Sequence, residues 1–204
     1  MKRVDDFCNP MTIRQRFLKW VYPLFVAFRK GGGVKNLENP GDKKPAVPFH
    51  SLSVELIDGK TLSFASLKGK KVLLVNTASD CGYTAQYTEL QKLYQHSRDE
   101  LEIIAFPSND FKEQEKKSEQ EIEQFCRKNY GVSFPITRKM IVVKRAGQHP
   151  IFEWLTHARM NGWNEQSPVW NFSKFLVNEE GILTHYFDPA VSPLSPPVTD
   201  AIHH

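Results

Sequence analysis

The feature that most constrains the fold is a short apolar run that leads into a cysteine and then into a helix. Residues 72–77 read Val-Leu-Leu-Val-Asn-Thr, which is typical of a strand covered on both faces. Residues 84–98 carry apolar side chains at helical spacing, namely Tyr87, Leu90, Leu93 and Tyr94. Cys81 therefore lies where a strand gives way to a helix. The unpaired N–H groups and the positive dipole end of that helix favour a thiolate, which is the reactive form of cysteine.

The same local sequence has an ordinary interpretation. Unpaired cysteines are among the most buried residues and usually act as small apolar fillers. Here the neighbours of Cys81 are Ser79, Asp80 and Gly82, which do not suit a tight apolar pocket. We therefore predict redox chemistry at Cys81. An inert Cys81 in a binding or scaffold protein is the alternative.

The composition excludes several other classes of protein. The three cysteines, Cys8, Cys81 and Cys126, are an odd number without a CxxC pair, which argues against a disulfide scaffold and a disulfide isomerase. The seven histidines show no metal-ligand spacing, so we predict no metal site and no cofactor. Residues 1–50 hold ten Lys and Arg against four Asp and Glu, whereas the remainder is nearly neutral. Because the folded domain lacks a basic excess, we expect no nucleic-acid partner.

The chain divides into three parts. Residues 1–33 form a basic, aromatic N-terminal segment. Residues 34–47 contain Gly and Pro among charged residues and are typical of a linker. Residues 48–204 have the length of one ordinary domain.

The N-terminal segment is apolar at its centre and basic at its ends. Residues 17–28 are mostly apolar or aromatic, and basic residues flank them, namely Arg14, Arg16, Arg29 and Lys30. Twelve residues are too few to span a bilayer as a helix. Three interpretations stay open: an interfacial anchor that contacts a membrane surface through residues 14–30, a helix that packs on the domain or a partner, and a signal peptide. Met11 is an alternative start to Met1.

The domain begins with a predicted hairpin. Asp58-Gly59 separates two alternating runs, residues 51–56 and 60–64. Residues 72–77, 84–98 and 101–106 then form a strand–helix–strand unit, which implies parallel strands. Ser118 and Glu121 have capping-box spacing and predict a helix that runs to about residue 129.

The C-terminal half continues the alternation of strands and helices. We predict a short strand over 140–143, a short helix over 151–157 and a second hairpin from residues 175–178 and 182–187, and no element in the proline-rich stretch 189–197. This order predicts an α/β fold with a mixed central sheet flanked by helices. A reactive cysteine at the first strand-to-helix turn indicates the thioredoxin-like type, here with an N-terminal hairpin.

Three polar side chains have the chemistry that a peroxide-reducing thiol needs. Gln114 lies just beyond a segment that follows the second strand of the unit, where ligand sites of α/β folds collect. Trp170 and Asn171 precede the last hairpin. Amide and indole N–H groups hold a thiolate and take up charge on a departing oxygen without titrating. Taken singly, each side chain also fits a structural role.

Five segments of the chain carry a resemblance to a known family. They are Asn76-Thr-Ala-Ser-Asp-Cys-Gly-Tyr-Thr84, Ala105-Phe-Pro-Ser-Asn109, Gln114-Glu115, Glu121-Ile-Glu-Gln-Phe-Cys-Arg-Lys-Asn-Tyr-Gly-Val132 and Trp170-Asn-Phe-Ser-Lys-Phe-Leu176. Over about residues 48–190 the chain resembles the glutathione peroxidase family, specifically its cysteine-containing, non-selenium, thioredoxin-dependent branch. The resemblance implies that Cys81 is the peroxidatic residue. It also implies that Gln114, Trp170 and Asn171 complete the family's catalytic tetrad.

The resemblance also changes the interpretation of Cys126. On the local pattern Cys126 is a buried core residue on the apolar face of a helix. The resemblance implies that it is the resolving cysteine, which condenses with the sulfenic acid on Cys81 to a disulfide that thioredoxin reduces. This step requires the helix over 118–130 to unwind locally.

Two residues depart from the family's pattern. The chain has Ser108 and Asp110 where the family commonly has cysteine and glutamine. The first change removes one disulfide partner. The second brings in a carboxylate, which would raise the pKa of the Cys81 thiol if the two lay close together.

Taken together, the sequence predicts a monomeric thiol peroxidase that responds to oxidative stress. Its substrates would be hydrogen peroxide and organic hydroperoxides, including those of lipids, and its reductant thioredoxin or glutathione. We expect it in the cytoplasm, with membrane association, periplasmic location and secretion left open. Two alternatives remain: a one-cysteine, glutathione-dependent peroxidase, and a peroxide sensor that relays oxidation to a partner protein.

Overall fold

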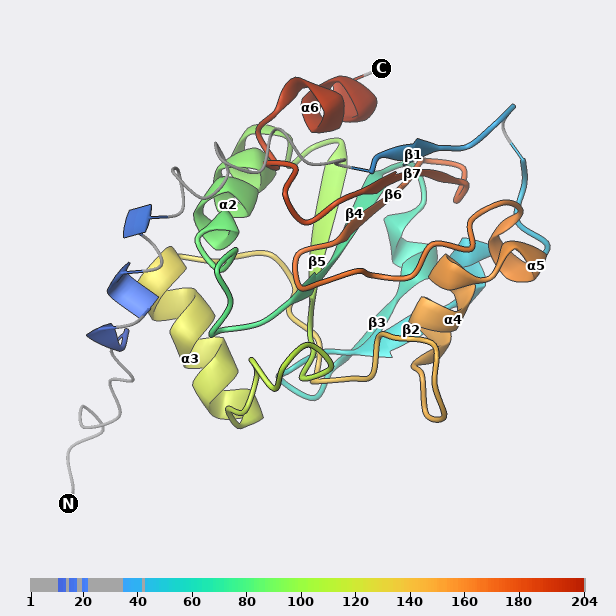
Figure 1. Cartoon of the computed structure of the whole chain (residues 1–204). Coiled ribbons are helices and arrows are strands. Elements are labelled where there is room, and N and C mark those ends of the chain that lie inside the picture. Colours follow the sequence, from blue (N-terminus) through green and yellow to red (C-terminus); the bar gives the residue numbers. More distant parts are fainter. Residues whose placement is uncertain (1–10, 14, 18–19, 22–34, 42, 204) are drawn as a thin grey trace.

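A five-stranded sheet forms the centre of the molecule. The computed structural model describes residues 11–13, 15–17, 20–21, 35–41 and 43–203. The strands lie in the order β1, β7, β6, β4, β5 (Figure 1), with β4 and β5 parallel and the other neighbours antiparallel. Their bounds are Leu37–Glu38 for β1, Lys71–Thr77 for β4, Leu101–Pro107 for β5, Lys174–Val177 for β6 and Leu183–Phe187 for β7. The predicted mixed sheet is confirmed.

The predicted strand–helix–strand unit is present as β4, α2 (Gln86–His96) and β5. Residues 72–77 of β4 are all buried, which explains their apolar character. Leu73 and Val75 pack into one hydrophobic cluster, whereas Val72 and Leu74 pack into a second, as the two-residue period of a strand requires. The helix begins two residues later than predicted because residues 81–85 form turns that lead away from the sheet.

Helices cover both faces of the sheet (Figure 1). One cluster packs α2, α3 (Glu119–Tyr130) and α6 (Pro196–His203) against the face that carries Leu73. The other face is covered by α4 (Pro150–Thr156), two 3-10 helices (Phe49–Ser51 and Phe64–Leu67) and the hairpin of β2 (Ser53–Glu55) and β3 (Thr61–Ser63). A short helix, α5 (Ala158–Asn161), follows α4. The molecule therefore has three layers, with the sheet in the middle.

The ends of α3 show how local sequence determines the helix bounds. The Ser118 side chain accepts a hydrogen bond from the Glu121 N–H (3.4 Å), and the Glu121 carboxylate accepts one from the Ser118 N–H (2.8 Å). This is the capping box that the sequence predicted. Gly131 ends the helix with φ 64°, a left-handed conformation that glycine adopts without a Cβ penalty.

Three segments differ from the sequence-based expectation. Leu37–Glu38, within the expected linker, adds β1 to the sheet edge. Residues 140–143 form a hydrogen-bonded loop instead of a strand. The chain after residue 195 forms α6, because Val198 and Ile202 lie on one helical face and are fully buried.

Part of the N-terminal segment packs on the domain. Gln15 is 5% exposed and donates a hydrogen bond to the Ser79 carbonyl (3.1 Å), and Met11 packs against the cluster on the α2 and α3 side. Three apolar side chains remain 60–88% exposed, namely Ile13, Phe17 and Trp20. Met1, Cys8 and most of residues 14–30 lie outside the described residues. Among the described residues, no helix combines the length and apolar composition needed to cross a bilayer.

Candidate active site

Cys81 lies in the turn between β4 and α2. Thr84 fixes the turn, because its hydroxyl accepts a hydrogen bond from the Cys81 N–H (3.0 Å) and lies 2.7 Å from the Cys81 carbonyl oxygen. The Cys81 Sγ accepts a hydrogen bond from the Tyr83 N–H at 3.4 Å. This backbone donor lies in the turn that precedes α2. The predicted position of Cys81 at a strand-to-helix junction is thus present in the structure.

Burial opposes the thiolate at Cys81. The residue is 1% exposed, and loss of hydration raises the pKa of its thiol. Hydrogen bonds from the Tyr83 N–H and from the Trp170 and Asn171 side chains act in the opposite direction, whereas the charge of Asp80 raises the pKa further. The expectation of a favoured thiolate was therefore wrong, since burial outweighs these hydrogen-bond donors.

The residues of the predicted tetrad converge although they are distant in sequence. The Asn171 Nδ2 donates a hydrogen bond to the Gln114 Oε1 at 3.0 Å, and the Asn171 and Trp170 side chains both reach the Cys81 thiol. Asn171 is fully buried, whereas Trp170 and Gln114 are half-buried. Trp170 and Asn171 thus both act to lower the pKa of the Cys81 thiol, and Asn171 is hydrogen-bonded to Gln114.

A strained turn presents Trp170 and Asn171. The next residue, Phe172, is fully buried and has φ 70°, a left-handed conformation that costs energy for a bulky residue. Asn76 at the end of β4 holds this turn, because its carbonyl accepts a hydrogen bond from the Phe172 N–H (2.6 Å) and its side-chain amide donates to the Trp170 carbonyl (3.0 Å). Packing of Phe172 against Tyr87 offsets the strain.

A cavity of about 500 Å³ opens beside the cysteine turn. Its walls come from four segments of the chain, which contribute Gly82 and Tyr83, Gln114, Val169 and Trp170, and Asp188 and Pro189. The wall at residues 188–189 was not anticipated from the sequence, because it depends on how the chain returns after β7. Trp170 also contacts Phe111, with ring centroids 5.5 Å apart.

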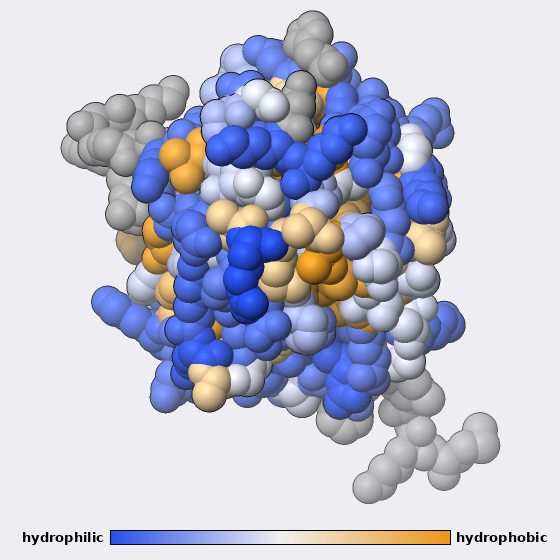
Figure 2. All heavy atoms as spheres, turned by 90° about the vertical axis from the view of Figure 1, so that its right-hand side faces the viewer, coloured by the Kyte–Doolittle hydropathy of each residue, from blue (hydrophilic) through white to orange (hydrophobic). Residues whose placement is uncertain are grey.

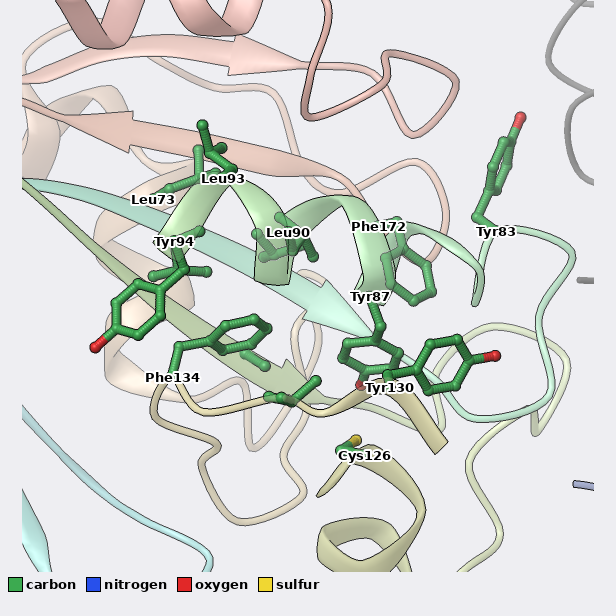
Figure 3. Close-up of a cluster of buried hydrophobic side chains, with 14 of the residues drawn as sticks. Leu73, Tyr83, Tyr87, Leu90, Leu93, Tyr94, Cys126, Tyr130, Phe134 and Phe172 are labelled. Carbon is green, nitrogen blue, oxygen red and sulfur yellow. The ribbon is translucent and has the colours of Figure 1, made fainter. Parts of the chain in front are cut away.

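Cys126 is buried in the interior beneath α2. It is fully buried on α3, and Figure 3 shows its side chain directed toward the ring of Tyr87. Burial raises the pKa of its thiol to about 12, against a hydrogen bond with the Tyr87 hydroxyl that lowers it. Cys81 and Cys126 are both free thiols in this state.

Asp110 acts elsewhere than at Cys81. Its carboxylate accepts hydrogen bonds from the Val142 N–H (2.7 Å) and the Val143 N–H (3.3 Å) and pairs with Arg145. It therefore ties down the loop that replaces the predicted strand over 140–143. The carboxylate that raises the pKa of Cys81 is that of Asp80.

Two buried charged residues near the site were not assigned a role from the sequence. Glu115 and Lys174 are both fully buried. Both lie within motifs of the resemblance, next to Gln114 and after Phe172 respectively, but a sequence pattern does not show which neighbour a long side chain reaches. In the described part of the chain, no three His, Cys, Asp or Glu side chains converge as metal ligands would.

Comparison with known proteins places the chain in a family. Residues 49–156 match the family model described as glutathione peroxidase. The glutathione peroxidase homolog BsaA of Halalkalibacterium halodurans is 41% identical over 147 residues, which are 72% of this chain and 92% of that protein. The glutathione peroxidase-like peroxiredoxin HYR1 of Saccharomyces cerevisiae is 41% identical over 148 residues, 72% of this chain and 90% of that protein.

Solved structures agree with this assignment. The crystal structure of Trgpx in its apo form has a TM-score of 0.59 and 29% identity, and covers 78% of this chain and 97% of that one. A thiol:disulfide interchange protein of the thioredoxin family from Chlorobium tepidum, with a TM-score of 0.55, 18% identity and coverage of 80% of this chain and 96% of that one, shares the fold. The chain belongs to the glutathione peroxidase family and has a thioredoxin-like fold, and its enzyme class is a peroxidase. The sequence predicted all three.

Proposed function

We propose that this protein reduces hydroperoxides through Cys81. The observation that carries the proposal is the buried Cys81 thiol next to Gly82 and Tyr83 of the cleft wall, with Trp170 and Asn171 lowering its pKa and Gln114 hydrogen-bonded to Asn171. The Cys81 sulfur attacks one peroxide oxygen, the O–O bond breaks, and the departing oxygen takes a proton to leave as water or alcohol. Cys81 becomes a sulfenic acid. The amide and indole N–H groups stabilise the charge that develops on the sulfur and oxygen atoms.

We propose that Cys126 resolves this sulfenic acid. Cys126 lies on the helix that packs beside the cysteine turn, in the same hydrophobic cluster as Cys81. Two relatives are named glutathione peroxidase-like peroxiredoxins, and Cys126 is a free thiol that could serve a two-cysteine cycle with thioredoxin as reductant. Because Cys126 is fully buried, α3 has to open locally before the two sulfur atoms can meet.

The decisive experiment compares the wild type with Cys126→Ser. Each protein would consume peroxide with thioredoxin and its reductase, or with glutathione. We expect the wild type to turn over with thioredoxin and the variant to lose that turnover at least about tenfold while it still reacts once with peroxide. Full activity of the variant with glutathione would instead identify a one-cysteine glutathione enzyme, which the burial of Cys126 favours as the second candidate. Fast reaction with peroxide but poor turnover with either reductant would indicate a sensor.

The same experiment has a structural readout. Hydrogen exchange in residues 118–130 should be faster in the oxidised wild type than in the reduced wild type, because the disulfide requires α3 to open. Equal protection in the two redox states would contradict the resolving role of Cys126.

We propose that the N-terminal segment contacts a membrane surface. Its exposed side carries Ile13, Phe17 and Trp20, spaced at one helical face, while Gln15 faces the domain. We expect the wild type to bind vesicles that contain anionic lipid. The variant in which these three residues are serine should no longer bind them. Equal vesicle binding by both proteins would rule out this contact.

We also propose a monomer in the cytoplasm, with access for bulky lipid hydroperoxides. The stretch between Pro150 and Trp170 is fully described and holds only α4, α5 and a short loop. On the face that contains these helices, hydrophobic residues form small patches among hydrophilic ones (Figure 2), unlike a large obligate interface. Light scattering that gave the mass of one chain would agree with this proposal, and a larger mass would contradict it.

A further inference from the structure

Glu115 joins the loop that carries Gln114 to the turn that carries Cys81. Its Oε2 accepts hydrogen bonds from both the N–H (2.7 Å) and the hydroxyl (2.8 Å) of Ser79, two residues before Cys81. The adjacent Asp80 N–H donates to the Gln114 carbonyl at 3.1 Å. A further hydrogen bond fixes the backbone of Glu115, whose N–H donates to the Asn109 Oδ1 at 2.9 Å. The two catalytic loops are thus tied together at Ser79 and Glu115.

A carboxylate in this place is unusual. Glu115 is fully buried, and its second oxygen, Oε1, lacks a hydrogen-bond partner among the described residues. Burial raises the pKa of Glu115 to about 7, although the two Ser79 hydrogen bonds and the charges of Lys117 and Lys139 lower it. A side chain with only a packing role would not need an ionisable group here.

The charge of Glu115 acts on the second cysteine as well. After burial and the Tyr87 hydrogen bond, the negative charge of Glu115 is the next influence on Cys126, and it raises the pKa of that thiol. It also raises the pKa of Tyr87, whose hydroxyl is hydrogen-bonded to the Cys126 thiol. The groups that face Glu115 are therefore Ser79, Tyr87 on α2, Cys126 on α3, and the two lysines 117 and 139.

Resting on the two-cysteine cycle proposed above, we propose that Glu115 is a positioning residue with opposite effects on its two steps. Its carboxylate holds the Cys81 turn against the Gln114 loop while Cys81 attacks the peroxide. The same negative charge disfavours the Cys126 thiolate and so delays the disulfide. In that second step the Cys126 sulfur displaces the hydroxyl from Cys81, the S–O bond breaks, the S–S bond forms, and the Cys126 proton leaves with the hydroxyl as water.

The test is Glu115→Gln, with Glu113→Gln as the matched control. Gln keeps the size and one acceptor oxygen but removes the charge. Glu113 is two residues away and pairs with Lys116 at 2.8 Å, and both side chains are about 70% exposed. After one equivalent of hydrogen peroxide at pH 8, tryptophan fluorescence would follow sulfenic acid formation, and acid quenching with mass spectrometry would follow the disulfide.

We expect Glu115→Gln to slow the peroxide step about tenfold, because a neutral acceptor holds Ser79 less strongly. We expect it to speed disulfide formation about threefold for each unit by which the Cys126 pKa falls, since the gain in thiolate is partly offset by lower nucleophilicity. Glu113→Gln should match the wild type in both steps. Between pH 6 and 8, the peroxide step of the wild type should depend more steeply on pH than that of Glu115→Gln. Burial raises the pKa of Glu115 into this range, whereas Lys174, whose pKa is also about 7, titrates in both proteins.

Two results would overturn the proposal. One is that Glu115→Gln slows both steps equally, which a merely structural role predicts. The other is that the rates of Glu115→Gln match those of Glu113→Gln. If Glu115→Gln does not fold, Ser79→Ala is the deciding variant, because it removes the hydroxyl hydrogen bond to Glu115 and keeps the charge. We expect Ser79→Ala to slow the peroxide step without speeding the disulfide step. Unchanged rates would refute the positioning role of this hydrogen bond. A wild type that forms no Cys81–Cys126 disulfide would refute the two-cysteine cycle instead, and the peroxide step would still decide the positioning role.

Discussion

Replacing Cys81 with serine should abolish peroxide reduction while leaving the fold intact. A hydroxyl is ionised far less than a thiol and is a much poorer nucleophile toward oxygen, so we expect the rate to fall at least about a thousandfold. The structure predicts little change in stability, because the Cys81 Sγ accepts one backbone hydrogen bond, from Tyr83 at 3.4 Å, that a serine hydroxyl can also accept. Thermal unfolding should therefore shift by no more than a few degrees.

Peroxide consumption and thermal unfolding measured on the same samples check this prediction. The matched control is Cys126→Ser, which should retain a first turnover with peroxide at the wild-type rate. Residual activity of Cys81→Ser near that of the wild type would show that a different group attacks the peroxide. Loss of the fold in Cys81→Ser would make its inactivity uninformative, and alkylation rates of the wild-type thiol at Cys81 would then decide whether it is reactive.

Replacing Lys174 with methionine should cost both stability and activity. Lys174 is fully buried on β6, and its Nζ donates hydrogen bonds to the Phe172 carbonyl (2.9 Å) and the Val191 carbonyl (2.7 Å). It also lies 3.5 Å from the carbonyls of Asp188 and Pro189, which line the cavity. Methionine fills the same volume but leaves buried carbonyl oxygens without a donor, which costs about 2–4 kcal/mol in unfolding free energy.

The activity should fall with the stability because Lys174 connects two walls of the site. One of its partners, Phe172, follows Trp170 and Asn171 directly, and the others lie in the segment after β7. We expect the peroxide reaction of Lys174→Met to slow about tenfold even below its unfolding temperature, since the donors to Cys81 lose their support. Lys60→Met is the control, because Lys60 lies on the exposed hairpin and pairs only with Asp58.

The buried amine also predicts how stability depends on pH. Burial lowers the pKa of Lys174 to about 7, well below its ordinary value of 10.5. Between these values the unfolded chain binds a proton that the folded chain does not, so the unfolding free energy of the wild type should rise with pH through this window. Denaturant titrations from pH 7 to 10 should show that rise in the wild type and a smaller one in Lys174→Met. Parallel curves would indicate that Lys174 stays charged in the folded state.

The local elements of this protein follow from short-range rules. The run over residues 72–77 is a short apolar stretch with two β-branched valines, typical of a strand covered on both faces, and the structure has it as β4. The capping box at Ser118 and Glu121 sets the start of α3 through bonds within four residues. Patterns of this kind are readable from the sequence since every interaction that produces them is local.

The elements that were missed depend on distant partners. Leu37–Glu38 is a strand only because it pairs with β7 nearly 150 residues later. Residues 196–203 form a helix whose stability comes from burying Val198 and Ile202 against the sheet layer. Neither segment carries enough local signal to overcome its proline or glycine content.

The sequence by itself determined the family and singled out the candidate site residues, because the chemistry of a side chain is a property of its type and its motif. Only the tertiary structure decided the burial, the pKa values and the hydrogen-bond partners of the residues at the site. It raised the pKa of the Cys81 thiol, where the sequence predicted a lowered one, since burial removes hydration that no local pattern records. It also placed Glu115 on Ser79 and Lys174 on the carbonyls behind the site, because long side chains choose partners by proximity in space.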